Sequence, residues 1–92
     1  MEFEWDASKE RRNLHKHGID FTTAMWVFKD SGRIEAYDGR AGFVEDRWAT
    51  IGLVSSTLLY VVYTVRGEEV IRLISARKAN GIERKCYCEA NP

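Results

Sequence analysis

The amino-acid sequence predicts an α+β fold in which helices pack on an antiparallel sheet. A short opening strand, two helical segments, four strand-like segments and a final helical segment follow one another along the chain. Strands and helices grouped in this way are typical of α+β proteins, whereas a parallel sheet alternates them. The segment 58–65 is apolar on both faces, so we expect it in the interior of a three- or four-stranded sheet. The first two helices should pack on one face of that sheet.

The opening strand and the first helix have clear boundary signals. Phe3 and Trp5 alternate with acidic residues, which predicts a short strand. Asp6 is a favoured N-cap residue, and a charged helix over residues 7–17 should follow it and end at Gly18. This helix has few apolar residues, so we expect it on the surface, held by one narrow stripe. That stripe consists of Ala7 and Leu14.

The second helix is predicted to be the better buried of the two. Asp20 should cap it, and its apolar residues recur at helical spacing. They are Phe21, Ala24, Met25 and Phe28, with Trp26 and Val27 widening the apolar face.

The rest of the chain predicts four strands and a helix. The strands cover residues 33–37, 47–54, 58–66 and 69–76. A Ser-Ser-Thr turn joins the second to the third, and Gly67 marks a hairpin between the third and the fourth. The tail over residues 80–89 predicts a final helix, with Ser75 or Asn80 as its possible start.

Composition limits the classes of protein to which this chain can belong. The 92 residues predict a single domain, 1–92, and a hydrophobic fraction of 45% excludes a disordered chain. No apolar run reaches membrane length and the start of the chain is acidic, so we expect a cytoplasmic protein without membrane contact. On a helix, Cys86 and Cys88 would point too far apart for a mutual disulfide. With His15 and His17 they give no zinc-site spacing, so neither a metal nor a cofactor is expected.

Charge is balanced overall but segregated along the chain. Fourteen Lys and Arg residues stand against fourteen Asp and Glu residues. The bases gather in the first helix and between residues 72 and 85, whereas residues 29–46 are mainly acidic. Basic segments that meet in space would form a phosphate-binding surface. The alternative is that they are ordinary solvated faces with local ion pairs.

Two further groups of residues each allow two interpretations. One side of the first helix carries Lys9, Asn13 and Lys16, with His17 next to it. The two lysines and the imidazole could bind phosphate there, and an imidazole can relay a proton near neutral pH. Lys16 and His17 could equally complement the dipole at the C-terminal end of the helix. Glu83, Arg84 and Tyr87 could act in the last helix as base, stabiliser and proton donor. The alternative is an amphipathic helix that docks on the sheet. Its docking residues would be Ile82, Cys86 and Tyr87.

Arg72 is the most unusual charged residue in the pattern. Strand alternation places it on one face with Val70, Ile74 and Ala76, an apolar setting in which a bare guanidinium is costly. It therefore needs a structural carboxylate partner, a phosphate to clamp, or an exit to solvent. Alternation places Arg77 on the opposite face, unless the chain has already turned.

Three stretches together carry a resemblance to a known family. The first reads Phe3-x-Trp5-Asp6-x-x-Lys9-x-x-x-Asn13-x-x-Lys16-His17-Gly18-Ile19-x-Phe21-x-x-Ala24. The second reads Glu45-Asp46-Arg47-x-x-x-Ile51-Gly52. The third reads Val70-Ile71-Arg72-x-Ile74-Ser75-Ala76-Arg77-x-Ala79, followed by Glu83-Arg84-x-x-Tyr87. The chain resembles the BrnT family of ribonuclease toxins over nearly its whole length.

The resemblance implies a fold, an activity and partners. The fold would be RelE-like: an antiparallel sheet with two N-terminal helices and a C-terminal helix. The activity would be metal-independent cleavage of RNA that halts translation in a type II toxin–antitoxin system. The partner would be a BrnA-like ribbon-helix-helix antitoxin, with operator DNA bound only through the complex. The implied catalytic residues are Arg72, Arg77, Arg84, Tyr87, Glu83 and His17, and the implied RNA-binding residues are Lys9, Lys16 and Arg47.

The expected reaction is attack of an RNA 2′-hydroxyl on the adjacent phosphate, which leaves a 2′,3′-cyclic phosphate. Arginines would stabilise the extra negative charge of the transition state, and Tyr87 or His17 would move protons. The competing class is a non-catalytic module that binds RNA or protein. A DNA-binding regulator acting alone is disfavoured, because no helix-turn-helix spacing is present.

Overall fold

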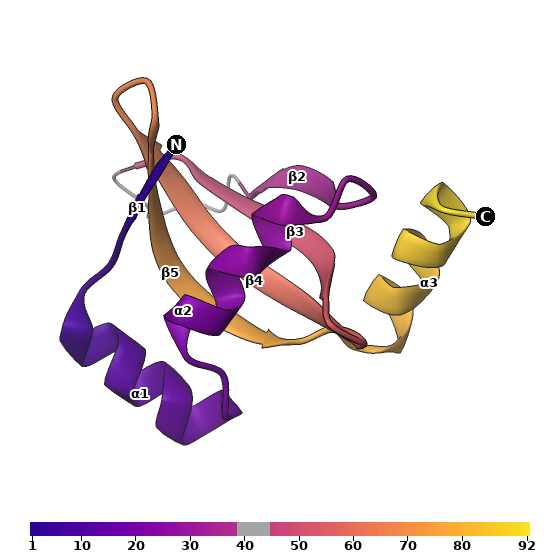
Figure 1. Cartoon of the computed structure of the whole chain (residues 1–92), viewed down its shortest axis with the longest axis horizontal. Helices are drawn as coiled ribbons and strands as arrows, with labels where there is room; N and C mark the ends of the chain where they lie inside the picture. Colours follow the sequence, from indigo (N-terminus) through magenta and orange to yellow (C-terminus); the bar gives the residue numbers. More distant parts are fainter. Residues whose placement is uncertain (39–44) are drawn as a thin grey trace.

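The computed structural model of the chain describes residues 1–38 and 45–92, and they form one five-stranded sheet with helices around it (Figure 1). The elements are β1 (Glu2–Glu4), α1 (Ala7–His17), α2 (Phe21–Ala24), the 3-10 helix η1 (Met25–Lys29), β2 (Ile34–Asp38), β3 (Arg47–Val54), β4 (Thr57–Arg66), β5 (Val70–Lys78) and α3 (Gly81–Ala90). The α+β class and the order of elements expected from the sequence are confirmed.

The sheet has the order β1-β5-β4-β3-β2, so β4 is its central strand. This confirms the interior position expected for residues 58–65. The sheet is larger than expected and is mixed, because β1 pairs with β5 in parallel while the other pairs are antiparallel. β1 has three residues and lies far from β5 in sequence, so no turn signal in the sequence could fix its direction.

The helix ends agree with the predicted capping residues. The Asp6 carboxylate accepts hydrogen bonds from the Ser8 hydroxyl and from the backbone N–H groups of Ser8 and Lys9, which lower the pKa of Asp6 to about 2. Gly18 ends α1 in the left-handed conformation, with φ of 73°. Asn80 caps α3 through a capping box with Glu83, so the final helix starts at Asn80 rather than at Ser75.

The attachment of α1 differs from the expected apolar stripe. Leu14 is 48% exposed, and the buried residue of this helix is Asn13. The Asn13 side-chain amide donates to the carbonyl oxygens of Ala76, at 2.8 Å, and Ile19, at 2.9 Å, and its oxygen accepts from Ala76 N–H at 3.0 Å. β1 pairs only with residues 70–72 of β5. Farther along β5, Asn13 therefore satisfies the backbone of Ala76 as a neighbouring strand would.

The core lies between the sheet and the α2–η1 segment. Phe21, Ala24 and Val27 are fully buried there. Trp26 was expected to widen this face but is 51% exposed. A 3-10 helix has three residues per turn, so Ala24 and Val27 share one side of η1 while Trp26 points elsewhere. Gly52 allows the close approach of η1, because a Cβ at this position would clash with Val27 Cγ2.

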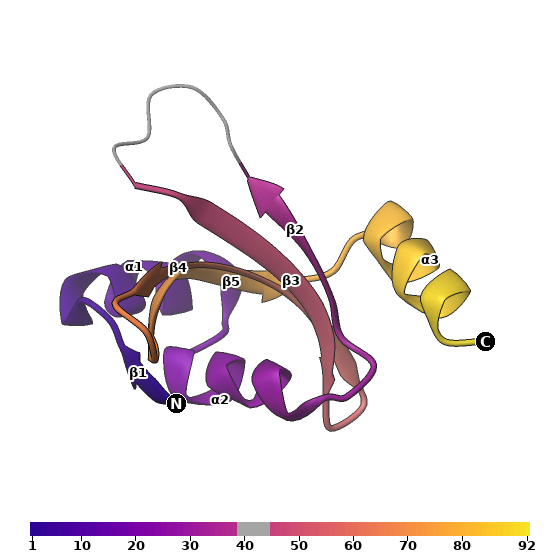
Figure 2. The same ribbon diagram turned by 90° about the horizontal axis from the view of Figure 1, so that it is seen from above.

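The three helices surround the sheet unequally. Phe21, Ala24 and Val27 pack against the sheet face formed in β4 by Leu59, Val61 and Tyr63. Figure 2 shows α2 and α3 on opposite sides of the curved β2–β3 pair. No residue of α3 is buried.

Candidate functional site

A β-bulge in β5 decides which arginines share a face of the sheet. Val62 of β4 lies opposite Ser75, whereas the next residue, Tyr63, lies opposite Leu73, so Ile74 is an extra residue. An extra residue inverts the alternation of side chains along the strand. Arg72 lies opposite Thr64 and Arg77 opposite Tyr60. Both arginines therefore lie on the face turned away from the core, about 13 Å apart at roughly 3.3 Å per strand residue.

This arrangement corrects the predicted surroundings of Arg72. Ala76 lies opposite Val61, a core residue, so Ala76 and Arg72 are on different faces. The expectation that Arg77 lies on the face opposite to Arg72 is also wrong, because the sequence pattern does not reveal the bulge.

Arg47 belongs to the same face. It starts β3, opposite Asp38 of β2, and the neighbouring pair Trp48 and Tyr63 places it beside Thr64. Two strand spacings separate Arg47 from Arg72, which corresponds to about 10 Å between their backbones. We call this surface the arginine face and define it by Arg47, Arg72 and Arg77.

Arg72 has a carboxylate partner. Its Nη1 donates to Glu4 Oε2 at 3.1 Å, and Arg66 Nε lies 3.9 Å from the other oxygen of Glu4. The Arg72 side chain is 24% exposed. The structural ion pair considered from the sequence is therefore present, and the side chain remains partly exposed to solvent.

Arg77 is held more tightly. Its two terminal nitrogens donate to the two Glu83 oxygens at 2.8 and 2.9 Å, and its guanidinium lies 4.2 Å from the centre of the Tyr60 ring. The hydrogen bonds from Arg77 lower the pKa of Glu83 and raise the pKa of Arg77. Glu83 is therefore ionised near neutral pH. Sequence reasoning missed Tyr60, whose only signal was its position in the doubly apolar strand.

The other α3 residues face different partners. Tyr87 Oη donates to Asp30 Oδ2 at 2.7 Å, and this bond raises the pKa of Tyr87. Arg84 Nη1 donates to the Ala79 carbonyl oxygen at 2.9 Å. Glu83, Arg84 and Tyr87 thus do not converge on one point, as a base, stabiliser and donor would. The alternative apolar docking of α3 does not hold for Ile82 either, because that residue is 77% exposed.

The predicted α1 residues gather in a separate place. Lys9, Lys16 and His17 line a hollow of about 320 Å³ between α1 and β5. In Figures 1 and 2, α1 and α3 lie at opposite ends of the molecule. His17 and Tyr87 therefore cannot serve the same phosphate.

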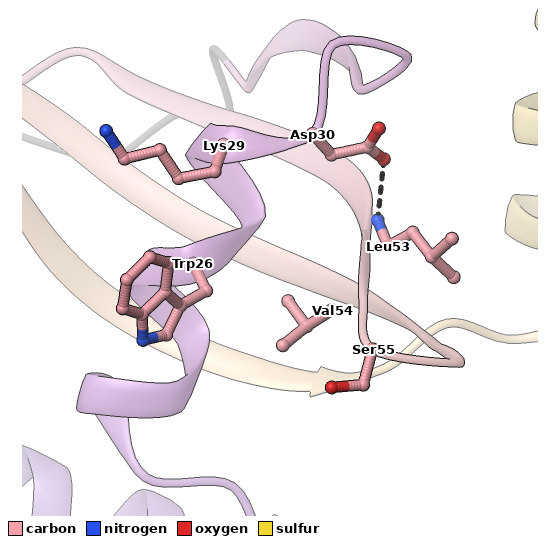
Figure 3. Close-up of a pocket in the computed structure, with 6 residues that line it drawn as sticks. All are labelled: Trp26, Lys29, Asp30, Leu53, Val54 and Ser55. Carbon is pink, nitrogen blue, oxygen red and sulfur yellow. Dashed lines mark hydrogen bonds between the residues drawn. The ribbon is translucent and has the colours of Figure 1, made fainter.

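A second hollow, of about 430 Å³, lies between η1 and the β3–β4 turn and has a different character (Figure 3). Its lining residues are Trp26, Lys29, Asp30, Leu53, Val54 and Ser55. Burial raises the pKa of Asp30, but hydrogen bonds from Tyr87, Leu53 N–H and Gly32 N–H outweigh burial and lower it. None of the predicted site residues lines this hollow.

Metal-binding clusters and membrane-spanning helices are absent from residues 1–38 and 45–92. This part of the chain has no group of three or more His, Cys, Asp or Glu side chains arranged to hold a metal ion. It also has no helix long and apolar enough to cross a membrane. Cys86 and Cys88 are exposed and form no disulfide, as expected.

Comparison with known proteins decides the family. The sequence model of BrnT, described as the ribonuclease toxin of a type II toxin–antitoxin system, matches residues 5–83. The chain belongs to the BrnT family. A crystal structure of the Brucella abortus ribonuclease toxin BrnT is similar to this BrnT chain with a TM-score of 0.65 and 25% sequence identity, and the match covers 87% of this chain and 97% of that one. A comparison with curated protein sequences gives no match.

Membership of the BrnT family confirms the resemblance drawn from the sequence motifs. This BrnT protein is a ribonuclease toxin of a type II toxin–antitoxin system, so its substrate is RNA and its partner is an antitoxin. The matched range contains the arginine face and the residues that line the hollow between α1 and β5, and it ends before Arg84 and Tyr87.

Proposed function

We propose that this BrnT protein cleaves RNA without a metal ion, on the arginine face, and thereby inhibits translation in the cytoplasm. The observation that carries the proposal is the bulge at Ile74, which places Arg72 and Arg77 on one face together with Arg47. Guanidinium groups fixed on a sheet can stabilise the charge that develops on a phosphate in the transition state. Before RNA binds, ion pairs with Glu4 and Glu83 hold two of them on this face.

In the proposed reaction the RNA 2′-oxygen forms a bond to the adjacent phosphorus, and the bond from phosphorus to the 5′-oxygen breaks. Arg72 and Arg77 leave their carboxylate partners and reach from opposite sides to the non-bridging oxygens. A phosphate that draws Arg77 away from Glu83 removes the contact that lowers the pKa of this carboxyl group. Glu83 is then able to accept the 2′-hydroxyl proton, and the 5′-oxygen takes a proton from water. This geometry favours Glu83 over Tyr87 and His17 as the group that moves the proton.

Incubation of the purified toxin with RNA in excess EDTA tests this function. We expect continued cleavage and fragments that end in 2′,3′-cyclic phosphate, which mass spectrometry identifies. Loss of cleavage in EDTA that is restored by added magnesium would refute metal independence. Fragments with linear 3′-hydroxyl ends would refute the 2′-hydroxyl mechanism.

A non-catalytic module that binds RNA or protein is the second candidate function for the arginine face. The observation in its favour is that Arg72 and Arg77 already have carboxylate partners, as structural arginines do. Binding of RNA without the appearance of any new RNA end would support this function instead.

We further propose that a BrnA-like ribbon-helix-helix antitoxin neutralises the toxin by covering the arginine face, and that operator DNA is bound only through the complex. A tight complex would bury on the order of 1,600 Å² or more. In a crystal structure of the complex we expect Arg72, Arg77 and Arg84 to be covered by an acidic or amphipathic segment. If all three stay exposed to solvent, inhibition is indirect and the masking proposal is wrong.

A further inference from the structure

The hollow between α1 and β5 contains Arg12 in addition to Lys9, Lys16 and His17, the three basic residues that the sequence already indicated. Its lining residues are Lys9, Arg12, Asn13, Lys16 and His17 from α1 and Ile74 and Ser75 from β5. We call it the α1 hollow. Arg12 and Ser75 join the three residues already considered, so one concave surface combines three permanent positive charges, an imidazole and a hydroxyl.

No carboxylate neutralises this charge in the part of the chain that the structure describes. The α1 hollow has no acidic lining residue. The ion pairs among the described residues join other side chains. Glu10, the acid within α1, accepts instead from the backbone N–H of Phe21 at 2.9 Å. Cations that converge without a counter-charge create a local positive potential, which attracts an anion.

The shape of the α1 hollow is fixed by the fold. Asn13 attaches α1 to Ala76 through two hydrogen bonds, so the cationic side chains project from a helix that is anchored to the sheet. The bulge at Ile74 brings Ile74 and Ser75 to the floor. Both floor residues lie on β5 between Arg72 and Arg77. Ser75 lies opposite Val62, on the same face as Arg72 and Arg77, so the α1 hollow adjoins the arginine face at the β5 edge.

We propose that the α1 hollow binds a backbone phosphate of the RNA substrate, next to the phosphate that is cleaved on the arginine face. The proposal rests on the proposed function, because the substrate must be RNA that already lies on the arginine face. The strand would pass over the β5 edge, from Arg72 and Arg77 to Arg12 and Lys16. Phosphate contacts position a nucleic acid without reading its sequence, so the hollow contributes affinity and register rather than chemistry.

Binding of an uncleavable RNA tests the subsite separately from cleavage. The probe is a short single-stranded RNA with 2′-O-methyl groups, whose binding is followed by fluorescence anisotropy at several salt concentrations. The double variant Arg12→Ala/Lys16→Ala removes two cations from the α1 hollow. The control, Arg11→Ala/Lys85→Ala, removes two exposed cations outside the hollow, so both proteins have the same net charge.

We expect the hollow variant to bind at least about fivefold more weakly than the control. We also expect its log-affinity to fall less steeply with log salt, by about 0.7 for each lost phosphate contact to a single strand. Equal affinities and equal slopes would overturn the proposal. Arg12 and Lys16 are exposed, and a thermal melt of each protein checks that it is folded.

A second pair of variants adds a charge instead of removing one. Ser75→Asp places a carboxylate on the floor of the α1 hollow, and Ser56→Asp places one in the exposed β3–β4 turn. Only Ser75→Asp should weaken binding of the RNA probe, again by about fivefold or more. Similar binding by the two variants would contradict the phosphate subsite.

Cleavage of natural RNA by the parental protein is measured in parallel. If the parental protein cleaves RNA, and Arg12→Ala/Lys16→Ala and Ser75→Asp bind the probe as well as their controls, the subsite is refuted and the proposed function stands. If these variants bind the probe more weakly than their controls but the parental protein does not cleave RNA, the proposed function is refuted and the α1 hollow remains a phosphate site.

Discussion

Replacement of Asn13 by alanine is expected to lower the free energy of unfolding by about 3 kcal/mol or more. The Asn13 amide makes three hydrogen bonds, two of them to the buried backbone of Ala76. Alanine would leave the Ala76 N–H and C=O groups and the Ile19 carbonyl without this partner. Each buried polar group that loses its partner costs about 1–3 kcal/mol. A small domain has a total stability of about 5–15 kcal/mol, so this single change removes a large part of it.

Urea denaturation of the parental protein and the variant measures the effect. Asn91→Ala is the matched control, because Asn91 also donates twice through its amide, to Gly32 O at 2.8 Å and Tyr87 O at 2.9 Å, but is exposed. We expect the control to change stability by less than about 0.5 kcal/mol. If Asn13→Ala is as mild as Asn91→Ala, the amide does not hold α1 to the sheet.

The boundaries of the elements could be predicted from the sequence because they depend on local chemistry. Asp6, Asp20 and Asn80 act on backbone groups two or three residues away, and Gly18 adopts its own left-handed conformation. The central position of β4 was also predictable, because a strand that is buried on both faces needs apolar residues at every position.

Features that depend on distant partners could not be predicted. Asn13 meets Ala76 across 63 positions of sequence, and nothing near Asn13 indicates that contact. The bulge at Ile74 exists only in relation to β4, and it reverses the side-chain alternation that a sequence pattern assumes. Trp26 was misplaced because an α-helical period was applied to a segment that forms a 3-10 helix.

The same distinction applies to the candidate site. Family motifs indicated Arg47, Arg72 and Arg77 as separate residues, but only the strand register places them on one face. The carboxylate partner of Arg72, Glu4, comes from the other end of the chain. Glu83 and Tyr87 are one helical turn apart in α3, yet one contacts Arg77 and the other contacts Asp30. Proximity on a helix therefore did not indicate a common function.

Replacement of Arg77 by alanine is expected to reduce the single-turnover rate of RNA cleavage by about 100-fold or more. This is the effect of removing one fixed donor that stabilises transition-state charge, and it corresponds to about 2.7 kcal/mol. Arg72→Ala should have a similar effect. Lysine at either position should restore activity only in part, because an ammonium group cannot make the two-pronged contact of a guanidinium. Arg11→Ala, on the exposed side of α1, should cleave at the parental rate.

A structural role for the arginines must be separated from a catalytic one, because each also forms an ion pair. The melting temperature of every variant identifies unfolding, and binding of the 2′-O-methyl RNA identifies loss of affinity. A catalytic role requires a folded protein that binds this RNA with little change and cleaves natural RNA slowly. If Arg72→Ala and Arg77→Ala are folded and cleave RNA at the parental rate, the arginine face is not the catalytic site. The helix that carries His17 then becomes the place to search for it.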